Sequence, residues 1–238
     1  MDDELEALRA ALKARDEAHQ TFLYRASHDL REPLRKIAAF SDLLKQDLGA
    51  DLPEAAAEDL GYILDASRRM QEMLDGLLVL SRLHQRTLAL ETVSARACAE
   101  QALRQVGAET LAVSWEPLPT LRTDPSLLTD CYRRILENAL QYARPEGPLE
   151  VLLTAEERAD AWVLGVHDNG VGIAERFAER VFLPFERLER RTAGSGPGMG
   201  LAIVQKQLGL LGGRAWVEPG QAGAHLRFSL PTSAASRP

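Results

Sequence analysis

The stretch Ser27-His28-Asp29-Leu30-Arg31-Glu32-Pro33-Leu34 places a histidine beside a carboxylate within a segment of helical periodicity. Apolar residues around it recur every three or four positions, which puts most of them on one stripe of a helix. His28 lies about 200° around the helix from Leu30, so the imidazole faces away from that stripe. A lone histidine there is most often a solvated surface residue. Pro33 has no N–H to donate to the Asp29 carbonyl, so we expect a local kink. The stripe comprises Leu23, Ala26, Leu30, Leu34, Ile37, Leu44 and Leu48.

Length and composition limit the possible functions. The 238 residues suffice for one or two domains with a real core. A net charge of −7 argues against nucleic acid or an anionic membrane as the main partner. No apolar run reaches the roughly 18 residues of a membrane helix, and the charged first 20 residues do not form a signal peptide. We therefore expect a cytoplasmic protein without membrane insertion. Cys98 and Cys131 match no metal spacing and are expected to be buried thiols, with one disulfide as the alternative.

The first 88 residues predict two long helices. Residues 1–20 suit either a short coiled coil with polar core positions or a frayed charged helix, and both readings stay open. Apart from Pro33, no proline or glycine interrupts residues 2–48, so one continuous helix is expected. Residues 47–53 form a stop and a turn, and a second helix runs from about Pro53 to Leu88. Because a lone hairpin cannot cover so broad an apolar face, we predict a homodimeric four-helix bundle.

The second half predicts a sheet with helices on one face, an α+β layer. Leu88 to Val93 alternates like a strand, and Ser94 can cap a helix that reaches about Val106. Asp124 is an N-cap before a proline, and it opens a helix that reaches about Ala143. The other expected strands lie at 111–115, 119–122, 149–154, 161–167, 214–218 and 225–230, and a further helix is expected at about 200–211.

Three segments carry candidate chemistry. In the loop 168–172, glycines allow close approach of a ligand, and the Asp168 carboxylate can accept a hydrogen bond from an exocyclic amine. The glycine-rich stretch 194–200 opens a helix, whose N-terminal N–H groups and dipole suit phosphate. Asn138 offers an amide oxygen to Mg²⁺, although it is equally a helix-surface residue. Neither a Rossmann nor a P-loop pattern frames the glycines.

Together these segments resemble a known family. In chain order, 27–34, 138–142, 168–172, 182–185 and 194–201 are similar to the H, N, G1, F and G2 boxes of the sensor histidine kinases of two-component systems. The first box is most similar to the kinase module of bacterial phytochromes and similar cytoplasmic sensors. The resemblance implies a HisKA-type dimerisation domain followed by a Bergerat-fold ATPase domain, so that the fold class is a long helical hairpin forming a dimeric four-helix bundle, then a mixed α/β sandwich.

The resemblance also implies domain limits and partners. Residues 1–20 would be a coiled-coil signal helix, 21–90 the dimerisation and histidine phosphotransfer domain, and 91–238 the catalytic ATP-binding domain. The kinase would bind ATP and Mg²⁺, act as a homodimer, and pass the phosphoryl group to the receiver domain of a response regulator. An upstream sensor domain would be missing from this chain.

Residue roles follow from the matched motifs. His28 would accept the γ-phosphoryl group, and Asp29 would take up the proton of its other ring nitrogen. Glu32 occupies the position four residues after the histidine, where a phosphatase function is located in many such kinases; it is also a candidate surface partner of Lys36. Asn138 would hold Mg²⁺, and residues of about 185–198 would form the ATP lid. The implied ATP-binding residues are Asn138, Tyr142, Asp168, Gly170, Gly172, Arg187, Gly196, Gly198, Gly200 and Leu201.

Two departures from the family pattern bear on activity. Arg134 stands where the family often has a second Asn, and Gln141 stands where it often has a Lys. The phosphate site would then be weaker, or a nearby arginine such as Arg144 would substitute. The absence of a Glu at position 134 argues against a gyrase-like or chaperone-like ATP hydrolase. We expect an ATP-dependent protein histidine kinase; the alternative is a non-catalytic or phosphatase-biased signalling module that keeps the fold.

Overall fold

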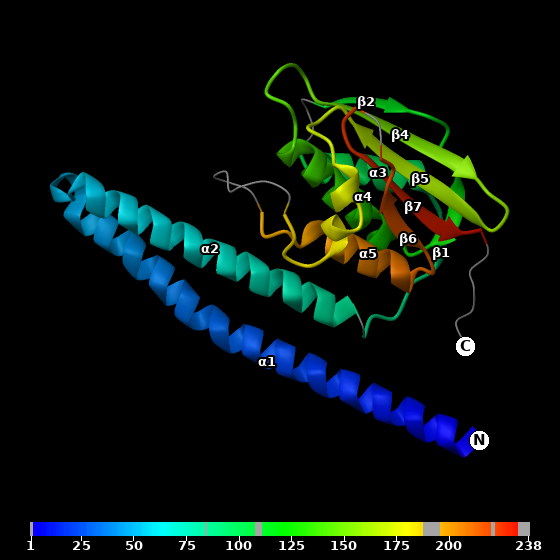
Figure 1. The fold of residues 1–238 in the computed structure, drawn as a ribbon, viewed down its shortest axis with the longest axis horizontal. Helices are drawn as coiled ribbons and strands as arrows, with labels where there is room; N and C mark the ends of the chain where they lie inside the picture. The colour runs from blue at the N-terminus through cyan, green and yellow to red at the C-terminus, as the bar shows by residue number, and fades with distance from the viewer. Residues whose placement is uncertain (1, 84, 108–110, 188–195, 220–221, 233–238) are drawn as a thin grey trace. The chain divides into compact units, whose positions relative to one another are not determined.

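The computed structural model describes residues 2–83, 85–107, 111–187, 196–219 and 222–232 (Figure 1). The chain forms two compact units, Met1–Gln85 and Arg86–Pro238. This division lies a few residues before the expected domain limit at 90. Among the described residues, no helix combines the length and apolar character needed to cross a membrane.

The first unit is a helical hairpin. Helix α1 (Asp2–Leu48) runs without interruption through Pro33, as the sequence predicts. A short 3₁₀ turn (Gly49–Asp51) leads to α2 (Glu54–Leu83). Buried positions of α1 recur every seven residues, at Ser27, Leu34 and Ser41, and mark the side that packs against α2. An ion pair between Arg31 and Asp75 joins the two helices.

Most of the predicted apolar stripe of α1 remains uncovered within one chain. Leu34 is 8% exposed, whereas Leu30 is 53% and Leu44 is 50% exposed. The stripe is too wide for one partner helix, so a hairpin buries one edge and leaves the rest in solvent. The exposed large apolar residues of this unit are Tyr24, Leu30, Ile37, Phe40, Leu43, Leu44, Leu48, Tyr62, Ile63 and Met70.

The segment after α2 differs from its prediction. The second helix ends at Leu83 instead of about Leu88, and strand β1 is Glu91–Ser94 instead of 88–93. The cause is a long-range contact: the Arg86 guanidinium and the Ala89 N–H both donate to the carboxylate of Asp124, at 3.2 and 3.1 Å. These bonds hold residues 86–89 in an irregular conformation that local periodicity does not reveal.

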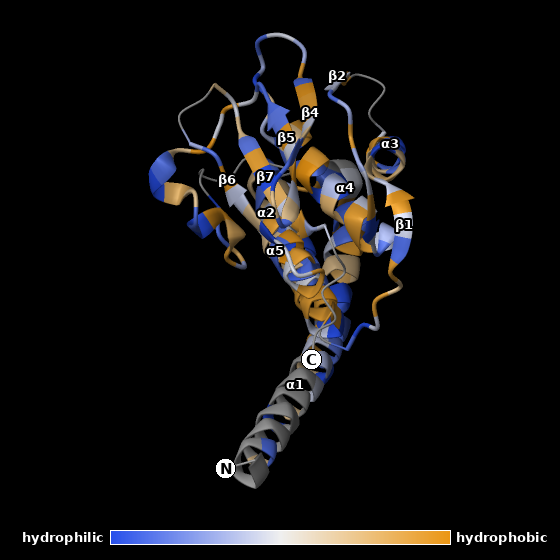
Figure 2. Ribbon diagram, turned by 90° about the vertical axis from the view of Figure 1, so that its right-hand side faces the viewer, coloured by the Kyte–Doolittle hydropathy of each residue, from blue (hydrophilic) through white to orange (hydrophobic). Residues whose placement is uncertain are grey.

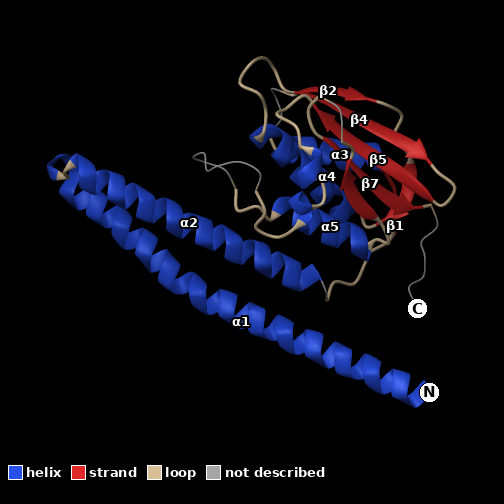
Figure 3. Cartoon of the chain, in the orientation of Figure 1, coloured by secondary structure: helices blue, strands red, loops and turns tan. Residues whose placement is uncertain are grey.

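The second unit is a two-layer α+β domain. Its main sheet has the order β2-β4-β5-β7-β6, with β2 parallel to β4 and the other pairs antiparallel, and β1 pairs separately with β3. Helices α3, α4 and α5 lie together on one side of the sheet (Figure 3). The elements are α3 (Ala95–Gln105), β2 (Ala112–Trp115), β3 (Thr120–Thr123), α4 (Pro125–Gln141), β4 (Glu150–Glu157), β5 (Ala161–Asp168), α5 (Gly200–Leu210), β6 (Arg214–Val217) and β7 (His225–Pro231), with short 3₁₀ turns at Glu175–Phe177 and Arg180–Phe182.

The helix starts follow from capping. Ser94 accepts a hydrogen bond from the Ala97 N–H, and Asp124 accepts from Ser126 and Leu127, as the sequence predicts for both caps. Proline at the first position of α4 has no N–H to leave unsatisfied.

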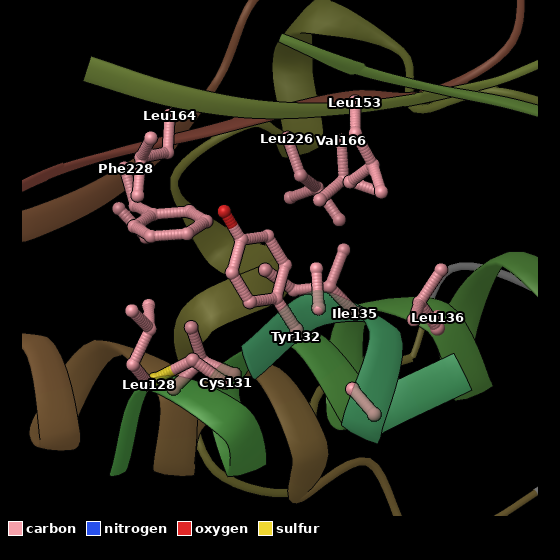
Figure 4. Close-up of a cluster of buried hydrophobic side chains, with 14 of the residues drawn as sticks. Leu128, Cys131, Tyr132, Ile135, Leu136, Leu153, Leu164, Val166, Leu226 and Phe228 are labelled. Atoms are coloured by element: carbon pink, nitrogen blue, oxygen red, sulfur yellow. The ribbon is translucent and has the colours of Figure 1, made fainter. Parts of the chain in front are cut away.

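The core lies between α4 and the sheet. Tyr132 of α4 packs edge-on against Phe228 of β7, with ring centroids 5.4 Å apart (Figure 4). Hydrophobic colouring recurs in bands along α4, β4 and β7 (Figure 2). Cys98 and Cys131 are buried free thiols within this core, so the alternative of a disulfide is wrong. This closed core fixes the C-terminal end of α4 beside the end of β5.

Candidate functional site

His28 lies in the open on α1. Its side chain is 70% exposed, and Nδ1 is 3.2 Å from the Asp29 carboxylate oxygen Oδ1. A neutral imidazole that donates its Nδ1 proton to Asp29 presents the lone pair of Nε2 to solvent. The geometry therefore suits a nucleophile whose proton-bearing nitrogen is held by a carboxylate.

Glu32 is engaged with a neighbour on the same helix. Its carboxylate lies 2.6 Å from Lys36 Nζ, the i,i+4 pair expected from the sequence. The hydrogen bond and charge of Lys36 lower the pKa of Glu32 below its usual range. The side chain is thus a surface carboxylate that stays ionised, which disfavours a role as a general base.

Asp168 ends β5 at the rim of the helical layer. The side chain is 7% exposed, and Oδ1 accepts hydrogen bonds from the N–H groups of Gly170 (2.9 Å) and Ala224 (3.1 Å). Burial raises the pKa of Asp168, against the lowering effect of these two bonds. Within the described residues no hydrogen bond to Oδ2 is found, so this oxygen is available to a ligand donor.

Gly170 fits tightly between Asp168 and the end of α4. A Cβ at this position would lie 2.5 Å from the Tyr142 carbonyl oxygen and 2.8 Å from the Asp168 carboxylate. The Val171 N–H donates to the same Tyr142 carbonyl at 3.0 Å. The predicted neighbours Asp168, Gly170 and Tyr142 are therefore brought together. Arg144 is also here: its Nε donates to the Gly170 carbonyl at 3.0 Å, so its guanidinium supports this loop.

Asn138 lies one turn before Tyr142 on α4. Both residues are half-buried, and the Tyr142 N–H donates to the Asn138 carbonyl. Within the described residues the Asn138 amide forms no hydrogen bond. Its oxygen is therefore available to a cation or to a water molecule. Gln141, between them, lies 3.9 Å from the position that a Cβ on Gly196 would occupy. The end of α4 thus contacts both glycine-containing segments.

The second glycine segment leads into α5. Gly198 has φ +76°, and a Cβ there would meet the Glu186 carbonyl at 2.7 Å and the Arg187 side chain at 3.1 Å. Helix α5 begins at Gly200 without a side-chain cap, so no capping side chain satisfies the first N–H groups, which in any helix have no intrahelical acceptor. Leu201 is 8% exposed and belongs to the core, where it anchors this helix start.

Part of the predicted ATP lid lies outside the described residues, which omit 188–195. The flanks of the lid meet each other, because the Phe185 N–H donates to the Gly198 carbonyl at 3.0 Å. Phe185 has φ +66°, a left-handed conformation that costs an aromatic residue energy and that often marks functional segments.

Arg134 points back along α4. Its Nε is 2.7 Å from Asp130 Oδ2, and the side chain is 16% exposed. Asp130 also accepts from Gln207 of α5 at 2.6 Å and pairs with Arg133. The positive charge of Arg134 is therefore neutralised by a neighbour, in a network that joins α4 to α5.

Sequence reasoning missed Gly223 and Ala224. A Cβ on Gly223 would lie 1.7 Å from the Asp168 carbonyl oxygen, and Ala224 forms hydrogen bonds with both the backbone and side chain of Asp168. Gly223 also lies against Gly172, because a Cβ on Gly172 would be 2.8 Å from the Gly223 carbonyl oxygen. The available signal was the pair of small residues directly before the last strand, which by itself resembles an ordinary turn.

Two family models match the chain. Residues 18–86 match the His Kinase A (phospho-acceptor) domain, and residues 123–234 match the histidine kinase-, DNA gyrase B- and HSP90-like ATPase. Together they cover most of the chain, in the order that the predicted domains require.

Curated relatives match along nearly the whole chain. Cyanobacterial phytochrome A of Nostoc sp. is 33% identical over 240 residues, covering 99% of this chain and 31% of the relative. Sensor protein PfeS of Pseudomonas aeruginosa is 33% identical over 250 residues, covering 98% of this chain and 53% of the relative. The chain thus spans about a third of the phytochrome and about half of PfeS.

Solved structures share the fold. Full-length ShkA in complex with AMPPNP has a TM-score of 0.58 at 25% identity, covering 90% of this chain and 47% of that chain. Histidine kinase ThkA, solved with response regulator protein TrrA, has a TM-score of 0.66 at 18% identity, covering 98% of this chain and 68% of that chain. From its two matched domains, its relatives and its fold, the chain belongs to the histidine kinase family.

Proposed function

We propose that this chain is the catalytic core of an ATP-dependent protein histidine kinase, which phosphorylates itself on His28 and passes the phosphoryl group to an aspartate of a response regulator. The observation that carries the proposal is the pairing of an exposed His28–Asp29 dyad with a domain in which Asp168, Gly170 and Tyr142 converge. The first supplies a nucleophile, and the second supplies a cradle suited to a nucleotide.

At His28 the reaction needs the lone pair of one ring nitrogen. Nδ1 donates its proton to Asp29, so Nε2 attacks the γ-phosphorus while the bond to the β-γ bridging oxygen breaks and ADP leaves. As Nε2 becomes bonded to phosphorus, the ring gains positive charge, and the Asp29 carboxylate stabilises that charge. The remaining catalytic effect is positioning of ATP and neutralisation of its charge.

The nucleotide site would divide into two ends. At the base end, Asp168 Oδ2 would accept from the adenine amine, with Gly170, Gly172 and Tyr142 lining the pocket. At the phosphate end, the N–H groups at the start of α5 would bind phosphate oxygens, aided by the helix dipole. Gly196, Gly198, Gly200, Leu201 and Arg187 would form this end; the bound AMPPNP in the ShkA complex supports a nucleotide in this fold.

Mg²⁺ fits the residues present. Described residues include no group of three His, Cys, Asp or Glu side chains that could hold a metal. Asn138 would therefore contribute a single amide oxygen, with phosphate oxygens and water completing the shell, as is usual for nucleotide-bound Mg²⁺. The ion would neutralise charge that develops on the phosphates. Arg134, paired with Asp130, neither competes with the cation nor replaces it.

A homodimer would complete the hairpin. The exposed apolar residues of α1 and α2 occupy the side that α1–α2 packing leaves open, and a second hairpin would cover them as a four-helix bundle. The matched phospho-acceptor domain supports this assembly. Because the chain spans about a third of its phytochrome relatives, we assign signal input to an upstream sensor domain, with residues 1–20 as the connecting helix.

The test is incubation of the chain with γ-³²P-ATP and Mg²⁺, followed by acid and base treatment. A phosphohistidine gives label that is lost in acid and stable in base. An acid-stable label would show that a residue other than a histidine is phosphorylated and would overturn the acceptor assignment. No label under conditions where calorimetry detects bound ATP would assign the chain to the non-catalytic signalling modules. Transfer is then tested by adding a purified receiver domain and following label from kinase to regulator.

A further inference from the structure

The face of the main sheet opposite the helices carries a polar cluster around two histidines. Since side chains alternate along a strand, His167 of β5 and His225 of β7 point away from the core that Val166 and Leu226 enter. The two histidines are direct register partners in the antiparallel pair β5–β7. The proposed nucleotide site uses neither of them.

The two imidazoles are in contact. Their ring centroids are 4.3 Å apart with an interplanar angle of 88°, and the two Nδ1 atoms are 2.6 Å apart. The other nitrogen of His167, Nε2, is 3.0 Å from the Thr154 hydroxyl of β4. Three adjacent strands therefore contribute to one hydrogen-bonded chain.

Gly165 makes this arrangement possible. A Cβ at this position would lie 2.3 Å from Thr154 Oγ1 and 2.5 Å from His167 Nε2. The missing side chain provides the space in which the His167 ring reaches Thr154. The orientation of His167 is thus built into the sheet.

The pair keeps a nitrogen lone pair available. A contact of 2.6 Å between two Nδ1 atoms requires that one donates and the other accepts, so the two rings share one proton between these atoms. Burial and the neighbouring His225 lower the pKa of His167 to about 4, so its ring is neutral near pH 7. Imidazole nitrogens with a free lone pair are the usual ligands of zinc and related ions; one Nδ1 of the pair has such a lone pair, and the other gains one when its proton moves to Nε2.

We propose that His167 and His225 form a two-histidine binding site for a divalent transition-metal ion, on the face of the sheet opposite the nucleotide cradle. The ion would take the place of the shared proton, which moves to Nε2 of its own ring. For two nitrogens bound at about 2.0–2.1 Å, the Nδ1 atoms must separate to about 3.0–3.4 Å, a small rotation of the half-buried His225 ring. Water would complete the coordination.

The neighbouring strands supply a hydrogen-bond partner for a metal-binding His167. In the metal-bound form the His167 Nε2–H donates to Thr154, which is the second-shell bond that fixes a metal-binding imidazole. The nearby Arg227 guanidinium is paired with Glu218 and Glu156, and Glu156 also pairs with Arg158, so these neighbouring charges balance and leave no net positive charge to repel an ion. Zn²⁺, Ni²⁺ and Cu²⁺ prefer imidazole, whereas Mg²⁺ prefers oxygen, which separates this site from the proposed Mg²⁺ site.

An ion at this position would link β5 to β7 on the far side of the sheet from the proposed nucleotide cradle, at residues next in sequence to Asp168 and Ala224. His167 precedes Asp168 and His225 follows Ala224, and Asp168 and Ala224 are themselves hydrogen bonded. The site would stabilise the same strand ends that hold the Asp168 carboxylate in place. Its existence does not depend on kinase activity.

The test is calorimetric titration of the whole chain with Zn²⁺ alone, without nucleotide, compared with Mg²⁺. We expect one Zn²⁺ site that H225Q weakens at least about tenfold and that T154V weakens about tenfold through the second shell. The matched control is H28Q, which removes the exposed histidine of α1 and should leave this site intact. In wild type, saturating Zn²⁺ should also raise the melting temperature of the second unit by about 5–10 °C.

Several results would overturn the proposal. Equal Zn²⁺ affinity in wild type, H225Q and T154V excludes the histidine pair, as does loss of the site in H28Q. Equal binding of Mg²⁺ shows a nonspecific carboxylate site. Circular dichroism of each variant confirms folding, and T154V keeps the test valid if H225Q does not fold.

Discussion

The two units of the chain differ in how much of their apolar surface each buries by itself. Ten of the fourteen exposed large apolar residues among the described positions belong to the hairpin, whereas the second unit, which is larger, has four. The second unit closes its core between α3–α5 and the sheet. The hairpin buries mainly one edge of each helix and leaves the rest open.

This difference means that the two proposed sites depend on different contacts. The proposed nucleotide cradle rests on contacts within one unit, such as Asp168 with Ala224 and Gly170 with Tyr142. The proposed acceptor His28 instead lies on a hairpin whose exposed apolar side we propose to be covered by a second copy. The stability of the hairpin should therefore depend on dimer formation, whereas affinity for ATP should depend on the second unit alone.

The largest expected effect is that of H28Q, which should reduce phosphohistidine to background. ATP affinity should stay within about twofold, because the acceptor and the cradle belong to different units. Label and calorimetric affinity are measured on the same preparation. Persisting label at another residue would refute the acceptor assignment.

Next in size is a charge placed on the open face of the hairpin. F40D should raise the dissociation constant of the dimer at least a hundredfold, about 3 kcal/mol, because the interface would bury an unpaired carboxylate. Sedimentation of residues 1–90 and of the whole chain measures it. The matched control is L152D, an exposed leucine of the second unit that should leave the dimer unchanged.

The cradle is tested by D168N, which should weaken ATP binding by about 1.5–3 kcal/mol, roughly tenfold to a hundredfold. An amide keeps the size of the side chain but can present a donor to the adenine amine. D160N, an exposed aspartate in the β4–β5 turn, is the control. Unchanged affinity in D168N would remove Asp168 from the proposed site.

A smaller effect concerns the α4–α5 network. Burial raises the pKa of Asp130, but the ion pair and hydrogen bond with Arg134 outweigh it, so the pKa is lowered overall. A lowered folded-state pKa contributes stability above the unfolded value of about 3.9, and this contribution is lost as pH falls through the folded pKa. D130N should therefore cost about 1–2 kcal/mol at pH 7 and less near pH 3, by denaturant unfolding at both pH values. A pH-independent difference would mean that the charge of Asp130 is not involved.

The smallest expected effect is on dephosphorylation. Glu32 presents an ionised carboxylate near His28, where it repels an anionic aspartyl phosphate, so E32T should shorten the half-life of the phosphorylated regulator. K36Q is the control, since it removes the partner and keeps the carboxylate. If wild type accelerates dephosphorylation and E32T abolishes that effect, Glu32 itself performs the phosphatase function.

Local signals in the sequence predicted the fold well. The caps Ser94 and Asp124, the continuity of α1 and the α+β layer follow from short-range chemistry that the structure retains. Contacts between distant segments could not be predicted. The ion pair between Asp124 and Arg86 goes with an α2 that is shorter than expected. Gly223, more than fifty residues after Asp168, lies against the Asp168 backbone. The pairing of Arg134 with Asp130 is different, because the two residues stand four apart on one helix and the spacing alone would have suggested it.

The bonds of Asp124 bear on where this protein can be cut or fused. The ATPase family match begins at residue 123, but Asp124 draws its partners Arg86 and Ala89 from before that point. Helix α3, also outside the match, contributes the fully buried Ala95, Ala99 and Ala102 to the same core. A recombinant fragment that starts at 123 would expose this core, whereas one that starts at Arg86 keeps it closed. The folding unit is thus longer than the segment that matches the ATPase family model, and domain exchange between relatives should preserve the longer segment.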